Sequence, residues 1–183
     1  MPVISAMGTH MASNAAAALA IALQHQVPAT DAIRALESYE DLPHRQEVLG
    51  TKGGITYEND SISTIPHSAL AALARFAPAP AHLLLGGMDR GVDPRELIDA
   101  LPETSVASIA LLGETLDVWQ DALRDVPCAV DRSGTLEHAL EFAQAQAAPG
   151  DVILLSPAAA SYDQFTNFAE RGHAFAALAG FKT

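Results

Sequence analysis

The sequence predicts an α/β protein: a Rossmann-like, mostly parallel sheet with helices on both faces, preceded by a short helical segment. Short apolar runs such as residues 152–155 alternate with segments of helical periodicity. These runs lack the alternation of a half-exposed strand, which is typical of parallel strands covered on both faces. The first 42 residues, by contrast, contain no strand pattern.

Composition narrows the class of protein before any motif is considered. A hydrophobic fraction of 49% over 183 residues is enough for a packed core. A formal charge of -12 argues against nucleic acid or an anionic membrane as the main partner. One cysteine cannot form an internal disulfide, and there is no apolar run of membrane-spanning length. We therefore expect a cytoplasmic, monomeric protein.

The N-terminal part is expected to be helical. Residues 12–23 are rich in alanine, which loses the least side-chain freedom in a helix. A second short helix is expected after Thr30, ending near Ser38. The pattern changes at Leu42-Pro43, so we expect two domains, residues 1–42 and 43–183.

The second domain is expected to begin with a hairpin. Residues 47–52 and 55–58 flank Gly53-Gly54, a dipeptide typical of tight hairpin turns. Pro66 suits the first turn of a helix that ends before Pro78. The other expected elements are a strand at 82–85, a helix from Asp93-Pro94 to 100, a strand at 106–112, a helix at 114–124, a strand at 128–130, a helix capped by Ser133 and ending at 147, a strand at 152–155 and a last helix at 164–179.

Three of these strands end in polar or glycine-rich loops, at residues 59–64, 86–91 and 156–161. In open parallel sheets the ligand crevice lies beyond the carboxyl ends of the strands. We therefore expect the three loops to converge on one site.

The loop at 156–161 contains small residues and hydroxyls, which let a ligand approach backbone amides. Near the start of the next helix, such amides favour a carboxylate or phosphate; the alternative is a plain tight crossover. Arg90 suits a carboxylate, since a guanidinium can bind both oxygens, or it is a solvated loop residue.

Asp60 and Thr64 are candidates for binding a ribose, a metal-bound water or an ammonium group. Alternatively, Ser63 or Thr64 only caps the helix at Pro66. His44-Arg45 lies at the domain boundary, where it could meet a nucleotide when domains close, or be ordinary surface.

Several familiar motifs are absent from the sequence. It has no G-x-x-x-x-G-K-[ST] phosphate loop, no G-x-G-x-x-G, no H-E-x-x-H and no paired C-x-x-C. We expect no metal site within this chain, and we interpret Cys128 as a small buried hydrophobe.

Taken together, the loops resemble the C-terminal domain of the Mur ligase family, specifically its glutamate-adding branch in peptidoglycan synthesis. The segments that carry the resemblance are Gly8-Thr9-His10 with Asn14, residues 42–47, Asn59-Asp60-Ser61, residues 84–87, residues 154–158, residues 161–165, Asn167-Phe168 and Glu170-Arg171-Gly172. Family members have three domains, and this chain resembles the end of the central one and all of the third. The family's ATP phosphate loop and magnesium ligands lie upstream, so the resemblance implies that this chain alone is inactive.

The resemblance also implies substrates and residue roles. ATP, with Mg²⁺, would activate the carboxylate of UDP-N-acetylmuramoyl-L-alanine as an acyl phosphate, which the amine of glutamate attacks. The implied glutamate ligands are Thr64, Arg90, Ser161, Tyr162 and Phe168. The implied nucleotide contacts are Asn14, Arg45 and Asp60, with His44 near the reaction centre.

The chain departs from the common family pattern at several of these loops. Ile62 stands where a lysine is usual, Arg90 replaces a lysine, Ala159 a cysteine and Tyr162 a leucine. Such changes around the amino-acid pocket favour a variant that adds L-glutamate rather than D-glutamate. The alternatives are a related ligase such as folylpolyglutamate synthase, and a free-standing module that binds an acidic metabolite.

Overall fold

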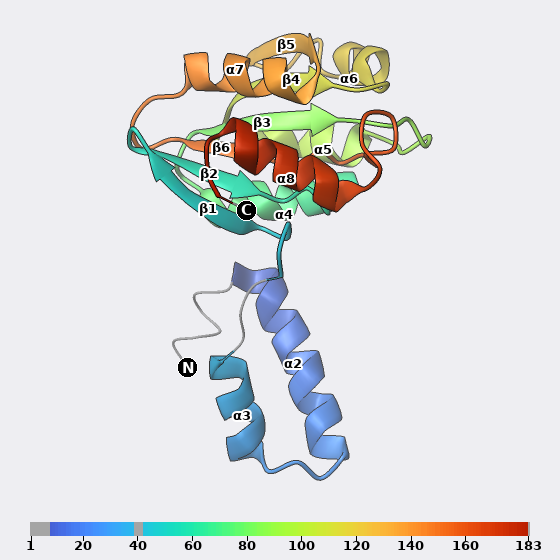
Figure 1. The fold of residues 1–183 in the computed structure, drawn as a ribbon. Helices are drawn as coiled ribbons and strands as arrows, with labels where there is room; N and C mark the ends of the chain where they lie inside the picture. The colour runs from blue at the N-terminus through green and yellow to red at the C-terminus, as the bar shows by residue number, and fades with distance from the viewer. Residues whose placement is uncertain (1–7, 39–41, 183) are drawn as a thin grey trace. The chain divides into compact units, whose positions relative to one another are not determined.

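The computed structural model describes residues 8–38 and 42–182, with side chains from Ala12 onward. The chain divides into two compact units, residues 1–41 and 42–183 (Figure 1). In the first unit, helices α2 (Gly8–Gln24) and α3 (Ala29–Glu37) pack against each other. This unit buries Ala15 and Ala32 among its described residues.

The second unit is built on a six-stranded sheet with the order β1-β2-β6-β3-β4-β5. The strands are β1 (Glu47–Lys52), β2 (Ile55–Asn59), β3 (Ala81–Gly86), β4 (Val106–Leu112), β5 (Ala129–Gly134) and β6 (Val152–Leu155). β1 and β2 form the antiparallel hairpin, and every other pairing in the sheet is parallel. Gly53 and Gly54 have φ values of 60° and 81°, the positive values that this type of tight turn needs. The expected fold class is confirmed.

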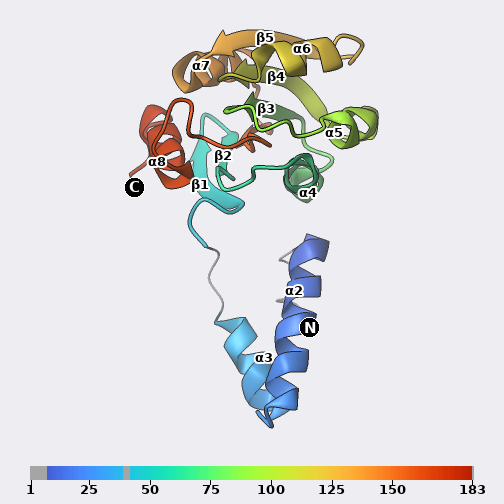
Figure 2. The same cartoon turned by 90° about the vertical axis from the view of Figure 1, so that its right-hand side faces the viewer.

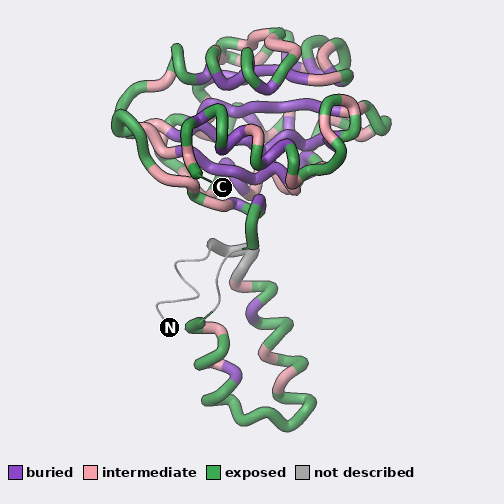
Figure 3. Tube along the Cα trace, viewed as in Figure 1, coloured by how far each residue is buried: buried purple, intermediate pink, exposed green. Residues whose placement is uncertain are grey.

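Helices cover both faces of this sheet (Figure 2). Helices α4 (Pro66–Phe76), α5 (Arg95–Ala100) and α6 (Leu116–Ala122) pack on one face, and α7 (Leu136–Gln146) and α8 (Phe168–Leu178) pack on the other. Successive residues of each central strand face opposite cores: Leu83 and Leu85 contact the first set of helices, and Leu84 contacts the second. The central strands β3, β4 and β6 are accordingly buried along most of their length, whereas the edge strands β1 and β5 are not (Figure 3).

Two of the expected helix starts are wrong. Ser133 lies within β5 and donates to Asp131 at 2.6 Å, and Thr135 is the residue that caps α7 by accepting from the His138 amide. The last helix begins at Phe168 and not at residue 164, because Asn167 accepts a hydrogen bond from the Glu170 amide at 2.9 Å.

Candidate functional site

The loops that follow β2, β3 and β6 meet at the carboxyl ends of the strands, as expected. Ser156 donates a hydrogen bond to Asp60 at 2.7 Å, which joins the loops after β6 and β2. The Met88 amide donates to the Ala160 carbonyl at 2.8 Å, which joins the loops after β3 and β6. Hydrogen bonds therefore link the three loops at one edge of the sheet.

Two glycines allow this close approach. A Cβ on Gly87 would lie 2.2 Å from the Ala160 carbonyl oxygen, and one on Gly113 would lie 2.2 Å from the Asp163 carboxylate. Both positions also have positive φ, 151° and 77°. A side chain at either position would push the loops after β3, β4 and β6 apart.

Arg171 is a central part of the site that sequence reasoning did not single out as functional. It lies in the first turn of α8, and its side chain is fully buried. Its guanidinium donates to the Ser61 hydroxyl at 3.0 Å and the Ser61 carbonyl at 2.8 Å. It also donates to the carbonyls of Ala159 at 3.0 Å and Ala160 at 3.3 Å. Burial lowers the pKa of Arg171 to about 10, so the group stays charged near neutral pH. Arg171 thus fastens the loop after β2 to the loop after β6.

The predicted glutamate ligands differ in exposure. Ser161 is 3% exposed, and its hydroxyl makes no hydrogen bond within the part of the chain that the structure describes. Tyr162 is 66% exposed and Phe168 is 37% exposed. Ser161 lies in the turn that precedes α8.

Arg90 is exposed and lines a hollow beside the loop after β6. The hollow is formed by Met88, Asp89, Arg90, Val92, Thr115, Val118, Trp119 and residues 158–160. Thr64 and Ser161 do not line it. Thr64 is half-buried just before α4, which Pro66 opens without a side-chain cap, so the expectation that Ser63 or Thr64 caps this helix is wrong.

Among the predicted nucleotide contacts, Asp60 already uses both of its carboxylate oxygens in hydrogen bonds within the chain. It is 1% exposed, and its two carboxylate oxygens accept from the Gln46 amide at 3.1 Å and from Ser156. Burial raises the pKa of Asp60, although hydrogen bonds from Ser63 and Ser156 oppose this. This environment fits a residue that positions loops better than one that contacts a nucleotide directly. Arg45 is exposed, and Asn14 belongs to the first unit.

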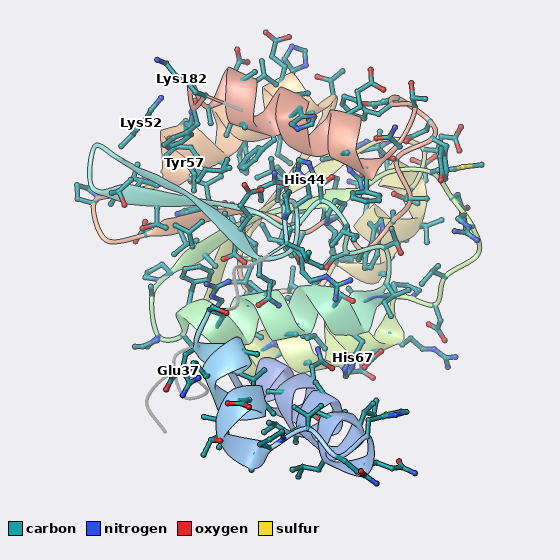
Figure 4. The ribbon with its side chains drawn as sticks, turned by 60° about the horizontal axis from the view of Figure 1, so that its bottom comes forward. Glu37, His44, Lys52, Tyr57, His67 and Lys182 are labelled. Carbon is teal, nitrogen blue, oxygen red and sulfur yellow. The ribbon has the colours of Figure 1, made fainter. Side chains whose placement is uncertain are left out.

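His44 lies where the second unit begins, beside α8 (Figure 4). Its side chain is 8% exposed, and its Nδ1 lies 2.8 Å from Asn59 Nδ2. Its ring stands edge-on to the rings of His173 and Phe168, with centroids 4.6 Å and 6.1 Å away. Burial lowers the pKa of His44 and the neighbouring His173 lowers it further, so the ring is neutral near pH 7.

A Cβ on Gly172 would lie 2.3 Å from His44 Nδ1, so α8 can approach the ring this closely because residue 172 is a glycine. Among the residues that the structure describes, no group of three or more His, Cys, Asp or Glu side chains could hold a metal ion. No helix in the same residues is long and apolar enough to cross a membrane.

Comparison with known proteins identifies the family. The model of the Mur ligase glutamate ligase domain matches residues 44–159. The UDP-N-acetylmuramoyl-L-alanine--L-glutamate ligase of Xanthomonas euvesicatoria is 37% identical over 95% of this chain and 38% of its own length. The UDP-N-acetylmuramoylalanine--D-glutamate ligase of Chlamydia caviae is 41% identical over 93% of this chain and 40% of its own length. The chain thus spans about two fifths of the length of these relatives.

Solved structures agree on the fold. The UDP-N-acetylmuramate-alanine ligase of Thermotoga maritima has a TM-score of 0.69 at 15% identity, over 93% of this chain and 37% of that one. A bifunctional folylpolyglutamate synthase/dihydrofolate synthase from Yersinia pestis has a TM-score of 0.53 at 19% identity, over 81% of this chain and 34% of that one. From the matched residues and the shared fold, the chain belongs to the Mur ligase family and contains its glutamate ligase domain.

Proposed function

We propose that this chain is the C-terminal part of a cytoplasmic, ATP-dependent ligase that joins glutamate to UDP-N-acetylmuramoyl-L-alanine during peptidoglycan synthesis. The observation that carries the proposal is the convergence of the loops after β2, β3 and β6 at the carboxyl edge of the sheet. A crevice at this edge is the usual ligand site of such sheets. The curated relatives named above are glutamate ligases, at higher identity than the folylpolyglutamate synthase.

The proposed roles use the side chains that the loop network leaves available. Ser161 offers a hydroxyl, and Arg90 offers the guanidinium that a glutamate side-chain carboxylate would need. Tyr162 and Phe168 border the same loop, and Thr64 completes the proposed set. Arg45 supplies a positive charge for the nucleotide, Asn14 is its proposed contact on the first unit, and Asp60 supports this contact by holding the loop after β2. His44 acts at the reaction centre.

The first unit, in this proposal, is the end of the central ATP-binding domain; the family's phosphate loop and magnesium ligands would lie upstream of it. Its exposed apolar side chains support this assignment: Ile21 is 60% exposed and Leu23 is 51% exposed. A two-helix unit with so small a core needs further chain to cover such residues. Because ATP activation would need the upstream phosphate loop and magnesium ligands, we propose that the 183-residue chain has no turnover by itself.

L-glutamate is the proposed stereoisomer, on the basis of the replacements Arg90, Ala159 and Tyr162 around the pocket. The test is a phosphate-release assay of the complete ligase with L-glutamate and D-glutamate side by side. We expect a higher kcat/KM for L-glutamate. Equal or greater activity with D-glutamate would refute this stereochemistry, and no activity with either would refute the proposed function.

The glutamate site is tested separately with Ser161→Ala combined with Arg90→Ala. Removing one hydroxyl and one cation should raise the glutamate KM at least tenfold, at about 1.4 kcal/mol per factor of ten. The affinity for the UDP-sugar substrate should stay within about twofold. Arg95→Ala is the matched control, since Arg95 is also an exposed arginine; it begins helix α5 and pairs with Asp93 just before that helix. Loss of UDP-sugar binding in the double variant would contradict the site assignment.

A further inference from the structure

The position of one proton on His44 can be derived from the groups around Asn59. A neutral imidazole carries its proton on Nδ1 or on Nε2, and the hydrogen bond made by one nitrogen decides which. Here Nδ1 faces the Asn59 carboxamide at 2.8 Å. The tautomer of His44 therefore depends on which way this carboxamide is turned.

The neighbours of Asn59 settle its orientation. Asn59 Oδ1 accepts from the Ser61 amide at 3.3 Å. Asn59 Nδ2 lies 3.3 Å from Glu47 Oε2 and 3.4 Å from the Gly172 carbonyl oxygen, and both of these atoms only accept. A carboxamide turned the other way would place its NH₂ group against the Ser61 amide donor and its oxygen against two acceptors. Asn59 must therefore donate to His44 Nδ1.

The consequence for His44 is a proton on Nε2. A proton on Nδ1 would place two donors face to face at 2.8 Å. The titratable groups that face the ring are Glu47 from β1 and His173 from α8. Glu47 Oε2 is 3.9 Å from Nδ1 and already accepts from the His44 backbone amide at 2.8 Å. Nε2 makes no hydrogen bond within residues 8–38 and 42–182, so its proton is available to a ligand.

We propose that Asn59 is a positioning residue that holds His44 as the neutral Nε2–H tautomer, so that His44 donates a hydrogen bond to an anionic ligand oxygen and does not accept a proton. The identity of that oxygen, phosphoryl or carboxylate, rests on the proposed function. The tautomer does not, because it follows from contacts within this chain.

The tautomer is tested by long-range ¹H–¹⁵N NMR of the chain with ¹⁵N-labelled histidine at neutral pH. His44→Gln assigns the signals of His44 by removing them. We expect the Nε2–H pattern in the unmodified chain, and a change to the Nδ1–H or doubly protonated pattern in Asn59→Asp, whose carboxylate accepts. Asn167→Asp makes the same chemical change at the α8 cap, where an aspartate also caps, and should leave His44 unchanged. An Nδ1–H or doubly protonated ring in the unmodified chain would overturn the proposal without the need for any folded variant.

The donor role is tested in the complete ligase by comparing two replacements of His44. A glutamine places an amide donor near the position of Nε2 but is no base, whereas alanine offers neither. We expect His44→Ala to lower kcat/KM for glutamate about 10²- to 10³-fold, the usual effect of losing one preorganised donor. The kcat/KM of His44→Gln should be at least tenfold higher than that of His44→Ala. Equal losses in both variants would refute the donor role.

The same kinetic data identify the oxygen. A loss confined to the glutamate KM identifies the glutamate carboxylate, and a loss in kcat identifies the reacting phosphoryl group. Inactivity of the unmodified ligase would refute the proposed function and leave the NMR result standing.

Discussion

Replacing Arg171 with methionine tests how the site loops are held together. The change removes four hydrogen bonds while keeping a long side chain of similar reach. Two acceptors keep other partners, since the Ala160 carbonyl still accepts from the Met88 amide and the Ser61 hydroxyl still donates to the Phe168 carbonyl. The carbonyls of Ser61 and Ala159 would be left buried without a donor.

The expected cost follows from those two orphaned carbonyls. Each costs about 1–3 kcal/mol, and part of this is offset because the variant no longer buries a charge. We expect a net loss of about 3 kcal/mol in the free energy of unfolding. At about 2–4 °C per kcal/mol for a chain of this size, the melting temperature should fall by about 6–12 °C.

The assay is calorimetric or circular-dichroism melting of the 183-residue chain. Arg95→Met is the control, because the Arg95 side chain is 82% exposed and pairs with Asp93 at the surface. It should change stability by less than about 0.5 kcal/mol. An Arg171→Met variant within about 1 kcal/mol of the unmodified chain would refute the view that Arg171 fastens the loops.

Three further predictions follow from the same contacts. Gly172→Ala gains about 1 kcal/mol of helix propensity, but the clash with His44 should outweigh this by about 1–3 kcal/mol; urea unfolding that shows stabilisation would refute the clash. Gly113→Ala should destabilise by at least about 1 kcal/mol in the same assay, because φ is 77° there and the added Cβ would lie 2.5 Å from the Gly87 Cα; unchanged stability would contradict this. The pKa of His44 lies below its ordinary 6.5 in the fold, so the unfolded chain binds this proton first as the pH falls. Stability should therefore decrease below about pH 6.5, and less so in His44→Gln; identical pH profiles would contradict this.

The sheet could be predicted because its strands carry local signals. Continuous apolar runs and the Gly53-Gly54 turn depend on residues close together in the chain, and the structure confirms both. The convergence of the loops followed from a general rule of parallel sheets. These features need no knowledge of which side chains touch.

Helix starts were harder to predict because several residues compete to be the cap. Ser133 is a good capping type, yet the strand continues through it to Gly134. The start of α8 had a readable signal, since Asn167 and Glu170 have the spacing of a capping box. Glu170 Oε2 accepts from the Thr166 amide at 2.7 Å, one residue before the Asn167 amide that the capping box would use.

The role of Arg171 was missed because an arginine next to a glutamate suggests an exposed helix face. The helical phase gave the opposite signal: Arg171 is four residues before the fully buried Phe175, on the face that packs against the sheet. A charged residue on a buried face needs partners, but the sequence does not show that these are the carbonyls of Ser61 and Ala159. Such partners come from loops distant in the chain, so only the folded structure identifies them.

These contacts divide the site into residues that build it and residues that remain for a ligand. Asp60, Arg171 and Gly172 are buried and engaged with other loops, so changes there affect folding and geometry together. Arg90 and Tyr162 are exposed and lie outside the Arg171 network. Substitutions at these two positions should therefore change the proposed amino-acid pocket at little cost in stability. Because of this separation, the proposed stereoisomer preference could change while the buried network of Asp60 and Arg171 stays the same.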